Sequence, residues 1–299
     1  MAAPRTWDEL LERGLRHLEL PEVLERLRSG LDPLAGLHLL PAIAAAVGAA
    51  APPPARARPT IVVRRPRGAA APANRPKAAG PSLPPGLAGP IAVELARAEE
   101  RLPGPDAMPG GSRYELKWDG FRACAQIRNG SIRLWSKNGT DLASRFPEII
   151  AGLGVVVPDG SVLDGELIIW SNDRLAFDLL QHRFAGGPAR AREQAREHPA
   201  SYVIFDLLAL AGEDLRDQPL RDRRSALETL SRTWSPPLEL SPMTDDIEVA
   251  RRWMREYRPF GVEGLMIKGA GTRYEPNLRR WVKFNSVGVL APAHDRSVV

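Results

Sequence analysis

The sequence contains a single cysteine, Cys124, among its 299 residues, which excludes an internal disulfide. Such scarcity is typical of proteins in a reducing compartment. The first residues, MAAPRTWDELLERG, carry acids where a secretory signal peptide needs an apolar stretch. The longest apolar run, near residues 41–51, is too short and too rich in alanine to span a membrane. These absences predict a soluble, cytoplasmic protein.

Acidic residues are missing from residues 51–90, although the whole chain has 36 of them beside 41 lysines and arginines. The segment is rich in proline and alanine, and such a composition buries too little apolar surface to offset its ordering entropy. We therefore expect a disordered linker, which either serves only as a tether or also touches nucleic-acid phosphates without sequence preference. Its basic residues are Arg56, Arg58, Arg64, Arg65, Arg67, Arg75 and Lys77.

The linker separates two regions of different pattern. Residues 1–50 begin with a capping box, Thr6 to Glu9, followed by leucines at helical spacing, which predicts a small helical element for docking rather than catalysis. Residues 91–286 predict an α+β domain of antiparallel sheets, and residues 287–299 a tail. In that domain we expect helices at 91–101, 146–152, 186–198 and 221–232, and strands at 113–118, 121–128, 131–136, 161–170, 201–207, 264–268 and 280–284.

Lys117 is the first candidate functional residue. It lies in YELKWDGFRACAQI, where alternating apolar residues around Asp119-Gly120 predict a β-hairpin with the lysine on its polar side. A K-x-D-G match alone occurs by chance in about one chain in twenty, and an exposed lysine before a turn is then the plainer interpretation. Downstream, however, further motifs follow in order: Ser136-Lys137-Asn138-Gly139, Asp164-Gly165-Glu166, Phe205-Asp206, Glu263-Gly264 with Lys268, and Trp281-Val282-Lys283.

Together these motifs resemble the nucleotidyltransferase domain, with its ATP-grasp-like fold, of covalent nucleotidyltransferases, and in particular of ATP-dependent DNA ligases. The resemblance covers roughly residues 92–286 and extends to small bacterial ligases of the end-joining or repair type. It implies that Lys117 attacks the α-phosphate of ATP to form lysyl-AMP. AMP would then pass to the 5′-phosphate of nicked or broken double-stranded DNA for strand joining in repair or recombination, which would associate the protein with the nucleoid.

The chemistry needs a neutral amine, whereas an unperturbed lysine has a pKa of about 10.4. Neighbouring cations or desolvation lower that pKa. The resemblance implies that Lys268 and Lys283 are these cations and that they also bind the α-phosphate.

The resemblance assigns the remaining roles residue by residue. Glu115 would recognise the adenine and Phe205 would stack on it, while Arg122 and Glu166 would hold the ribose side. Glu166 and Glu263 would bind Mg²⁺, directly or through water. Lys137 stands where the family has arginine, so the charge stays but the bidentate fork is lost. Near another family arginine position lie Arg279 and Arg280.

Two departures from the family pattern affect the expected activity. Asn285 replaces a second lysine of the final motif, and fourteen residues follow it. An OB-fold domain needs about 100 residues, so we expect adenylation to be slow or to depend on an OB-fold protein in trans.

Two alternatives stay open. The first is an RNA ligase or capping-type guanylyltransferase, against which the D-G-E and W-V-K contexts and the Ala/Arg/Pro-rich composition favour the DNA enzyme. The second is a degenerate homologue that acts as a DNA- or partner-binding module. The missing OB-fold and Asn285 support it, whereas the retained reactive residues oppose it, namely Lys117, Glu166, Glu263, Lys268 and Lys283.

Overall fold

A computed structural model describes residues 80–285 of the chain. The helical element expected at residues 1–50, the linker as far as residue 79 and the tail at 287–299 lie outside the described residues. The last part of the expected linker, residues 80–90, is described, and there Leu87 is completely buried. Within the described residues no helix is long and apolar enough to cross a membrane.

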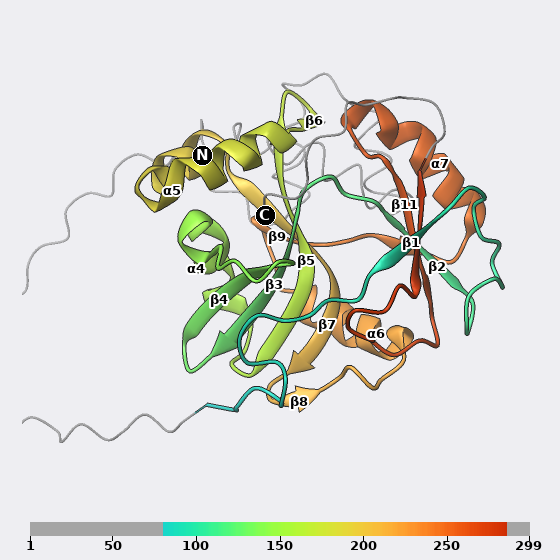
Figure 1. Cartoon of the computed structure of the whole chain (residues 1–299), viewed down its shortest axis with the longest axis horizontal. Helices are drawn as coiled ribbons and strands as arrows, with labels where there is room; N and C mark the ends of the chain where they lie inside the picture. Colours follow the sequence, from blue (N-terminus) through green and yellow to red (C-terminus); the bar gives the residue numbers. More distant parts are fainter. Residues whose placement is uncertain (1–79, 286–299) are drawn as a thin grey trace, which may run out of the picture. The chain divides into compact units, whose positions relative to one another are not determined.

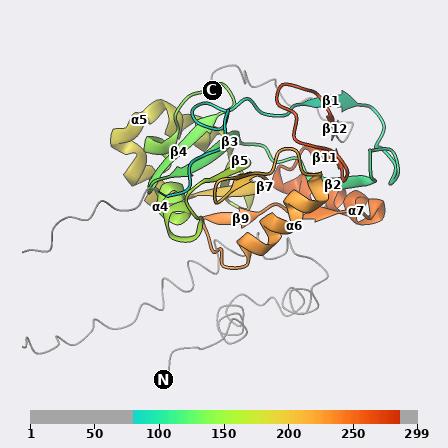
Figure 2. The same ribbon diagram turned by 90° about the horizontal axis from the view of Figure 1, so that it is seen from below.

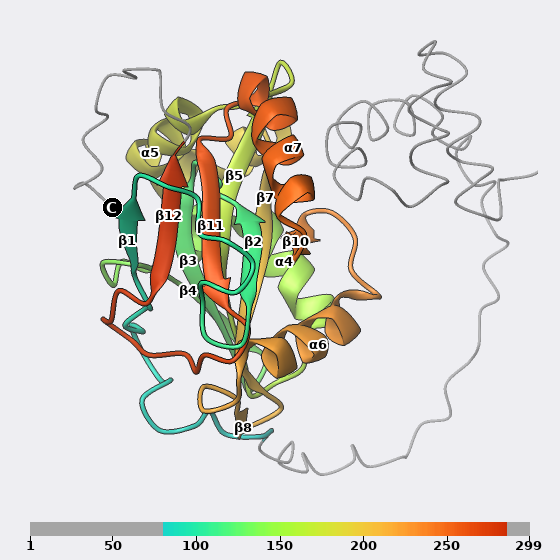
Figure 3. The ribbon, with the colours of Figure 1, turned by 90° about the vertical axis from the view of Figure 1, so that its right-hand side faces the viewer.

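Two β-sheets form the centre of the domain (Figure 1). The first has the order β1 (Ala96–Glu99), β12 (Trp281–Asn285), β11 (Gly264–Gly269), β2 (Ser112–Leu116) and β10 (Met243–Thr244). The second has the order β4 (Ser131–Ser136), β3 (Phe121–Arg128), β5 (Ser161–Ser171), β7 (Ala200–Leu210) and β8 (Glu213–Asp214), with β6 (Arg174–Leu175) beside β5 and β9 (Leu238–Leu240) beside β7. Figure 3 shows the first sheet in front of the second.

Helices cover the outer sides of this pair of sheets. Near the second sheet lie α4 (Pro147–Val156) and α5 (Phe177–Glu197), and near the first lies α7 (Ile247–Tyr257), at opposite ends of the view in Figure 2. A further helix, α6 (Leu220–Ser231), packs against β7, and short 3₁₀ turns occupy Ala143–Arg145 and Arg258–Phe260. The structure therefore confirms the α+β class and the expected helices near 146–152 and 221–232.

Within residues 80–285, a larger and a smaller cluster of apolar side chains pack against the second sheet. The larger joins one face of the second sheet to the helices, through residues such as Leu163, Ile149, Leu180 and Leu227. The smaller lies toward the first sheet and includes Leu87, Val93, Val162, Phe205 and Trp281. Because both faces of the second sheet are covered, its central strands β5 and β7 are buried on both sides.

The expected hairpin at Asp119-Gly120 is wrong. β2 pairs with β11 and β10 in the first sheet, while β3 pairs with β4 and β5 in the second. Residues 117–120 therefore cross from one sheet to the other. The crossing is tight, since a Cβ on Gly120 would lie 2.1 Å from the carbonyl oxygen of Leu167. Period-2 alternation predicted the strands but not their partners, which depend on long-range packing.

Three smaller expectations also need correction. Residues 91–101 form no helix; they contain β1, because backbone pairing with β12 overrides local helix propensity. The sheets are mixed, since β1 runs parallel to β12 and β7 parallel to β9. The helix expected at 186–198 begins at Phe177 and is kinked at Gly187 (φ 69°, ψ 177°), directly before Pro188.

Candidate active site

A cavity of about 510 Å³ is lined by residues of both sheets. From the first sheet come β1, β2, β11 and β12, and from the second come β3, β4, β5 and β7. The segment 117–120 that crosses between the sheets lies at the same cavity. Every residue that the resemblance assigned to ATP lines it: Glu115, Lys117, Arg122, Lys137, Glu166, Phe205, Lys268 and Lys283.

Lys117 is paired with the carboxylate that was expected to bind a metal. Its backbone N–H donates to the carbonyl of Gly264 (2.9 Å), which brings it beside the Glu263-Gly264 motif at the start of β11. Its Nζ forms an ion pair with Oε2 of Glu263. An ammonium has no free lone pair, so Lys117 could act as a nucleophile only after its amine has lost a proton and the carboxylate has released it.

Glu115 and Lys268 form a second, fully buried ion pair on neighbouring strands. The Nζ of Lys268 lies 3.1 Å from both carboxylate oxygens of Glu115. It also lies 4.4 Å from the ring centroid of Phe205 and 4.2 Å from that of Trp281. Burial raises the pKa of Glu115, although the charge of Lys268 opposes that rise. The structure thus gives Lys268 a carboxylate partner of its own, where the sequence suggested a cation acting on Lys117.

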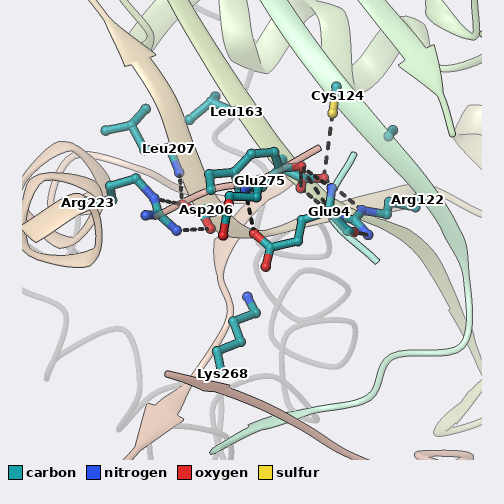
Figure 4. Close-up of polar contacts among 12 residues, drawn as sticks. Glu94, Arg122, Cys124, Leu163, Asp206, Leu207, Arg223, Lys268 and Glu275 are labelled. Atoms are coloured by element: carbon teal, nitrogen blue, oxygen red, sulfur yellow. Dashed lines mark hydrogen bonds and ion pairs between the residues drawn. The ribbon is translucent and has the colours of Figure 1, made fainter. Parts of the chain in front are cut away.

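Arg122 is held in place by a bidentate pair and by two aromatic rings. Its Nε and Nη2 donate to the carboxylate of Asp164 at 3.0 and 2.6 Å. The guanidinium lies 4.7 Å from the ring centroid of Trp281 and 5.4 Å from that of Phe205. Figure 4 shows Arg122 within a wider group of buried polar side chains. Such a clamp fixes the guanidinium plane at the cavity wall before any ligand binds.

Glu166 faces the cavity from β5, directly opposite Arg122 in the pairing of β5 with β3. Burial raises the pKa of Glu166 to about 8, while the charges of Arg122 and Lys117 lower it and those of Asp164 and Asp119 raise it further. When a cation binds near a partly buried carboxylate with a raised pKa, the cation stabilises the ionised form of that carboxylate.

These carboxylates fit a magnesium ion that arrives with a nucleotide. Among residues 80–285 there is no group of three or more acidic, histidine or cysteine side chains that could hold a metal by itself. Mg²⁺, however, is usually held by one or two carboxylates together with phosphate oxygens and water. Glu166 would supply one such carboxylate, and Glu263 a second after leaving Lys117.

Of the two arginines near a family arginine position, Arg279 and Arg280, only Arg279 is among the residues that line the cavity. Arg279 lines the cavity and donates to the carbonyl of Ala96 (3.0 Å). Arg280 is absent from the lining and pairs with Glu275. Arg279 is therefore the better candidate for contact with a phosphate or ribose. Asn285 ends β12 and is exposed.

Sequence reasoning missed an apolar wall of this cavity. Phe177 and Phe184 line it from α5, and Trp281 lines it from β12. Phe121 packs edge-to-face against Phe177 at 5.3 Å between ring centroids. The signal was present as Phe177, Gln181 and Phe184, which share one helical face, but no motif marks that pattern as functional.

Comparison with known proteins identifies the family. The family model described as "ATP dependent DNA ligase domain" matches residues 100–285. DNA ligase C2 of Mycolicibacterium smegmatis is 35% identical over 172 residues, covering 58% of this chain and 49% of the relative. DNA ligase C of Mycobacterium tuberculosis is 34% identical over 194 residues, covering 64% and 52%.

Among solved structures, the ligase domain of M. tuberculosis LigD is 26% identical with a TM-score of 0.48, covering 64% of this chain and 60% of that one. This chain spans about half the length of the relatives DNA ligase C2 and DNA ligase C. The family model, in contrast, covers most of the chain and the whole of the cavity's strands from β2 to β12. The chain therefore belongs to the family of ATP-dependent DNA ligase domains.

Proposed function

We propose that this chain carries out the adenylation step of DNA ligation, with Lys117 as the nucleophile. The observation that carries the proposal is the cavity itself, which gathers Lys117 and all the expected nucleotide-binding residues from seven separate places in the sequence. In this step Lys117 Nζ forms a bond to the α-phosphorus of ATP. The bond from that phosphorus to the bridging oxygen breaks, and pyrophosphate leaves.

The chain's own residues divide the work of that step. The carboxylate of Glu263, already paired with Lys117, is positioned to accept the proton that the ammonium must lose. Lys137, Lys283 and Arg279 bring positive charge to the same cavity for the phosphates. Mg²⁺, when held by Glu166, would neutralise charge on the phosphate oxygens, and Glu263 would join as a ligand only when it is neither paired with Lys117 nor protonated.

The adenine is best placed against Phe205. Its ring and that of Trp281 meet edge-to-face at 5.8 Å between centroids, and both line the cavity next to Lys268 of the Glu115–Lys268 pair. A purine stacked on Phe205 would lie within reach of this buried pair, which carries both an acceptor and a donor. We propose that this pair is what recognises the base, in place of Glu115 alone.

We further propose that AMP passes from Lys117 to the 5′-phosphate of nicked DNA, and that the 3′-hydroxyl then displaces it to join the strands in repair. The relatives are named DNA ligases, which supports DNA as the substrate. Dependence on an OB-fold protein in trans, association with the nucleoid and a function for the basic segment 51–90 in DNA binding stay predictions.

Mass spectrometry of the intact chain after incubation with ATP and Mg²⁺ tests the first step. A covalent AMP adduct is expected on the wild type and not on Lys117→Ala. Arg133→Ala is the control, since it removes an exposed cation that lies outside the cavity lining. Parallel incubation with GTP distinguishes a ligase from a capping-type enzyme. An adduct that persists in Lys117→Ala would disprove the assignment of the nucleophile.

A further inference from the structure

Glu94 lies in the extended segment before β1 and is completely buried. It does not line the cavity, and none of the motifs of the sequence includes it. Its backbone N–H, its carbonyl and one of its carboxylate oxygens bind β3 and the connection between β11 and β12. Its N–H donates to Tyr274 Oη (3.1 Å), its carbonyl accepts from Arg122 Nη1 (2.6 Å), and its Oε2 accepts from the N–H of Glu275 (3.0 Å), as Figure 4 shows for Arg122 and Glu275.

The backbone around Glu94 is bonded to the connection between β11 and β12. Val93 accepts from the N–H of Asn277 (2.9 Å), and the N–H of Leu95 donates to Leu278 (2.8 Å). The side chain of Glu94 adds the bond to Glu275 in the same connection. Since this connection leads directly into β12, whose first residue lines the cavity, the position of the cavity wall depends on these contacts.

Glu94 is also an unmatched acid in a group of buried charges. Within the described residues, three of the four other buried acids have a cation of their own, in the pairs Arg122–Asp164, Arg223–Asp206 and Lys268–Glu115, and the fourth, Glu239, forms no ion pair there. Glu94 forms no such ion pair there, and its Oε1 is buried without a hydrogen-bond partner. A buried carboxylate without a cation is far more costly than a buried neutral carboxylic acid.

We infer that Glu94 is a positioning residue, which as a neutral carboxylic acid fixes Arg122 and residues 274–278 against the cavity and so sets the affinity for ATP. The inference rests on the proposed function, since it assumes that this cavity binds ATP. An ionised Glu94 would compete for the cations that now hold Asp164, Asp206 and Glu115, and it would draw water into the segment. Both effects loosen the wall that carries Arg122.

The surroundings bring the ionisation of Glu94 into the neutral pH range. Burial raises the pKa of Glu94 to about 7, with the hydrogen bond from Glu275 N–H lowering it, the charge of Asp206 raising it, and the charges of Arg223 and Lys268 lowering it. The titratable or charged groups facing it are Arg122 from β3, Asp164 from β5, Asp206 from β7, Arg223 from α6, Lys268 from β11 and Tyr274 from the connection.

The test compares ATP binding by the full wild-type chain and Glu94→Gln between about pH 6 and about pH 8.5, with EDTA present so that no adenylation occurs. Titration calorimetry gives the Kd. Glutamine keeps the carbonyl acceptor for Glu275 but cannot ionise. If only neutral Glu94 supports binding, the wild-type Kd rises by up to about tenfold per pH unit above its pKa, and Glu94→Gln lacks this component. ATP and Glu166 titrate in both proteins, so their contributions cancel in the comparison.

Two further variants sharpen the result. Glu94→Ala loses the contact with Glu275 and should bind ATP more weakly at every pH. Glu99→Gln, on the exposed strand β1, is the matched control and should follow the wild type. Urea unfolding of all four proteins distinguishes an effect on stability from an effect on ATP affinity. A purely structural role of Glu94 would change the free energy of unfolding but leave the Kd profiles of wild type and Glu94→Gln parallel.

Parallel Kd profiles would overturn the inference while leaving the proposed function intact. A wild-type chain that binds no ATP would overturn both, since there would be no nucleotide for Glu94 to affect. If Glu94→Ala does not fold, the comparison of the wild type with the near-isosteric glutamine variant is sufficient by itself.

Discussion

Lys117 and Glu263 form an ion pair at the cavity, although they lie 146 residues apart in the sequence. The pair places the proposed nucleophile against the carboxylate that is proposed both to accept its proton and to bind Mg²⁺. These two tasks exclude one another in time, because a carboxylate bound to the ammonium is not available to a metal. Opening of this pair is therefore a necessary event on the way to lysyl-AMP.

Replacement of Glu263 tests that dual assignment. Glu263→Gln should bind ATP with little change in Kd but form the AMP adduct at least about tenfold more slowly, a loss typical of a missing proton acceptor. Quenched-flow assays with labelled ATP measure the rate. Glu256→Gln, an exposed acid on α7, is the control. Wild-type rates in Glu263→Gln would rule out the proposed proton transfer.

The Glu115–Lys268 pair should behave as a unit in stability measurements. Lys268→Met leaves a buried carboxylate without its cation and should lower the free energy of unfolding by about 3–5 kcal/mol. The double variant Lys268→Met with Glu115→Gln should recover most of that loss, since no uncompensated charge remains. Urea unfolding of the two single variants and the double variant measures this coupling. Strictly additive effects would show that the two residues do not depend on one another.

The raised pKa of Glu166 predicts that the free energy of unfolding depends on pH. Its pKa in the folded chain, about 8, lies above the ordinary value of 4.5. The folded state therefore binds the proton more tightly than the unfolded state does. The stabilising contribution of protonated Glu166 is fully present below about pH 4.5 and is lost as the pH rises toward 8. Glu166→Gln should remove this component, so the variant should gain stability over the wild type between about pH 5 and about pH 8.5 in urea unfolding with EDTA.

The same titration affects metal binding in the opposite direction. Mg²⁺ needs the ionised carboxylate, so the affinity for Mg²⁺ in the presence of ATP should increase with pH until about pH 8. Glu166→Gln should weaken Mg²⁺ binding and flatten this profile. Calorimetric titration of Mg²⁺ into the ATP-loaded chain, with Lys117→Ala as background to prevent turnover, measures it. An unchanged profile in the glutamine variant would exclude Glu166 as a ligand.

Arg122 should not tolerate a change to lysine. Lysine keeps the charge but cannot make the two parallel bonds to Asp164 together with the bond to the Glu94 carbonyl. Arg122→Lys should weaken ATP binding about tenfold, measured by calorimetry. Arg133→Lys is the control, because Arg133 on β4 is exposed and its partner Asp141 lies outside the cavity lining. Equal effects of both changes would contradict a specific function for Arg122.

The basic segment gives a prediction about DNA. Changing its seven arginine and lysine residues between 56 and 77 to glutamine should reduce the salt dependence of binding to nicked duplex DNA, because each phosphate contact adds about 0.9 to the slope of log K against log salt. Fluorescence anisotropy across a salt series measures the slope. The packed residues 80–90 remain unchanged in this variant, so its domain should stay folded. If the wild type and the glutamine variant give the same slope, the segment does not contact DNA phosphates and serves only as a tether.

The sequence by itself determined which residues could carry the chemistry. The spaced motifs around Lys117, Glu166, Phe205 and Lys283 supply residues that line one cavity, and they can be found in the sequence because side-chain chemistry and order along the chain are properties of sequence. Strand positions followed from alternation, as β3 and β4 show. Strand partners did not, since pairing depends on contacts between distant segments, and the apparent hairpin at Asp119-Gly120 became a crossing between two sheets.

Tertiary structure alone decided how the charges are matched. From the sequence, Lys268 could equally be a cation for a phosphate or a partner for an acid, and only the adjacency of β11 and β2 places it on Glu115. Glu94 carries no sequence signal at all; its burial beside three complete ion pairs makes it an unmatched acid. The pairing and protonation of these buried charges depend on desolvation and on which charges folding brings close together. Neither can be deduced from local sequence.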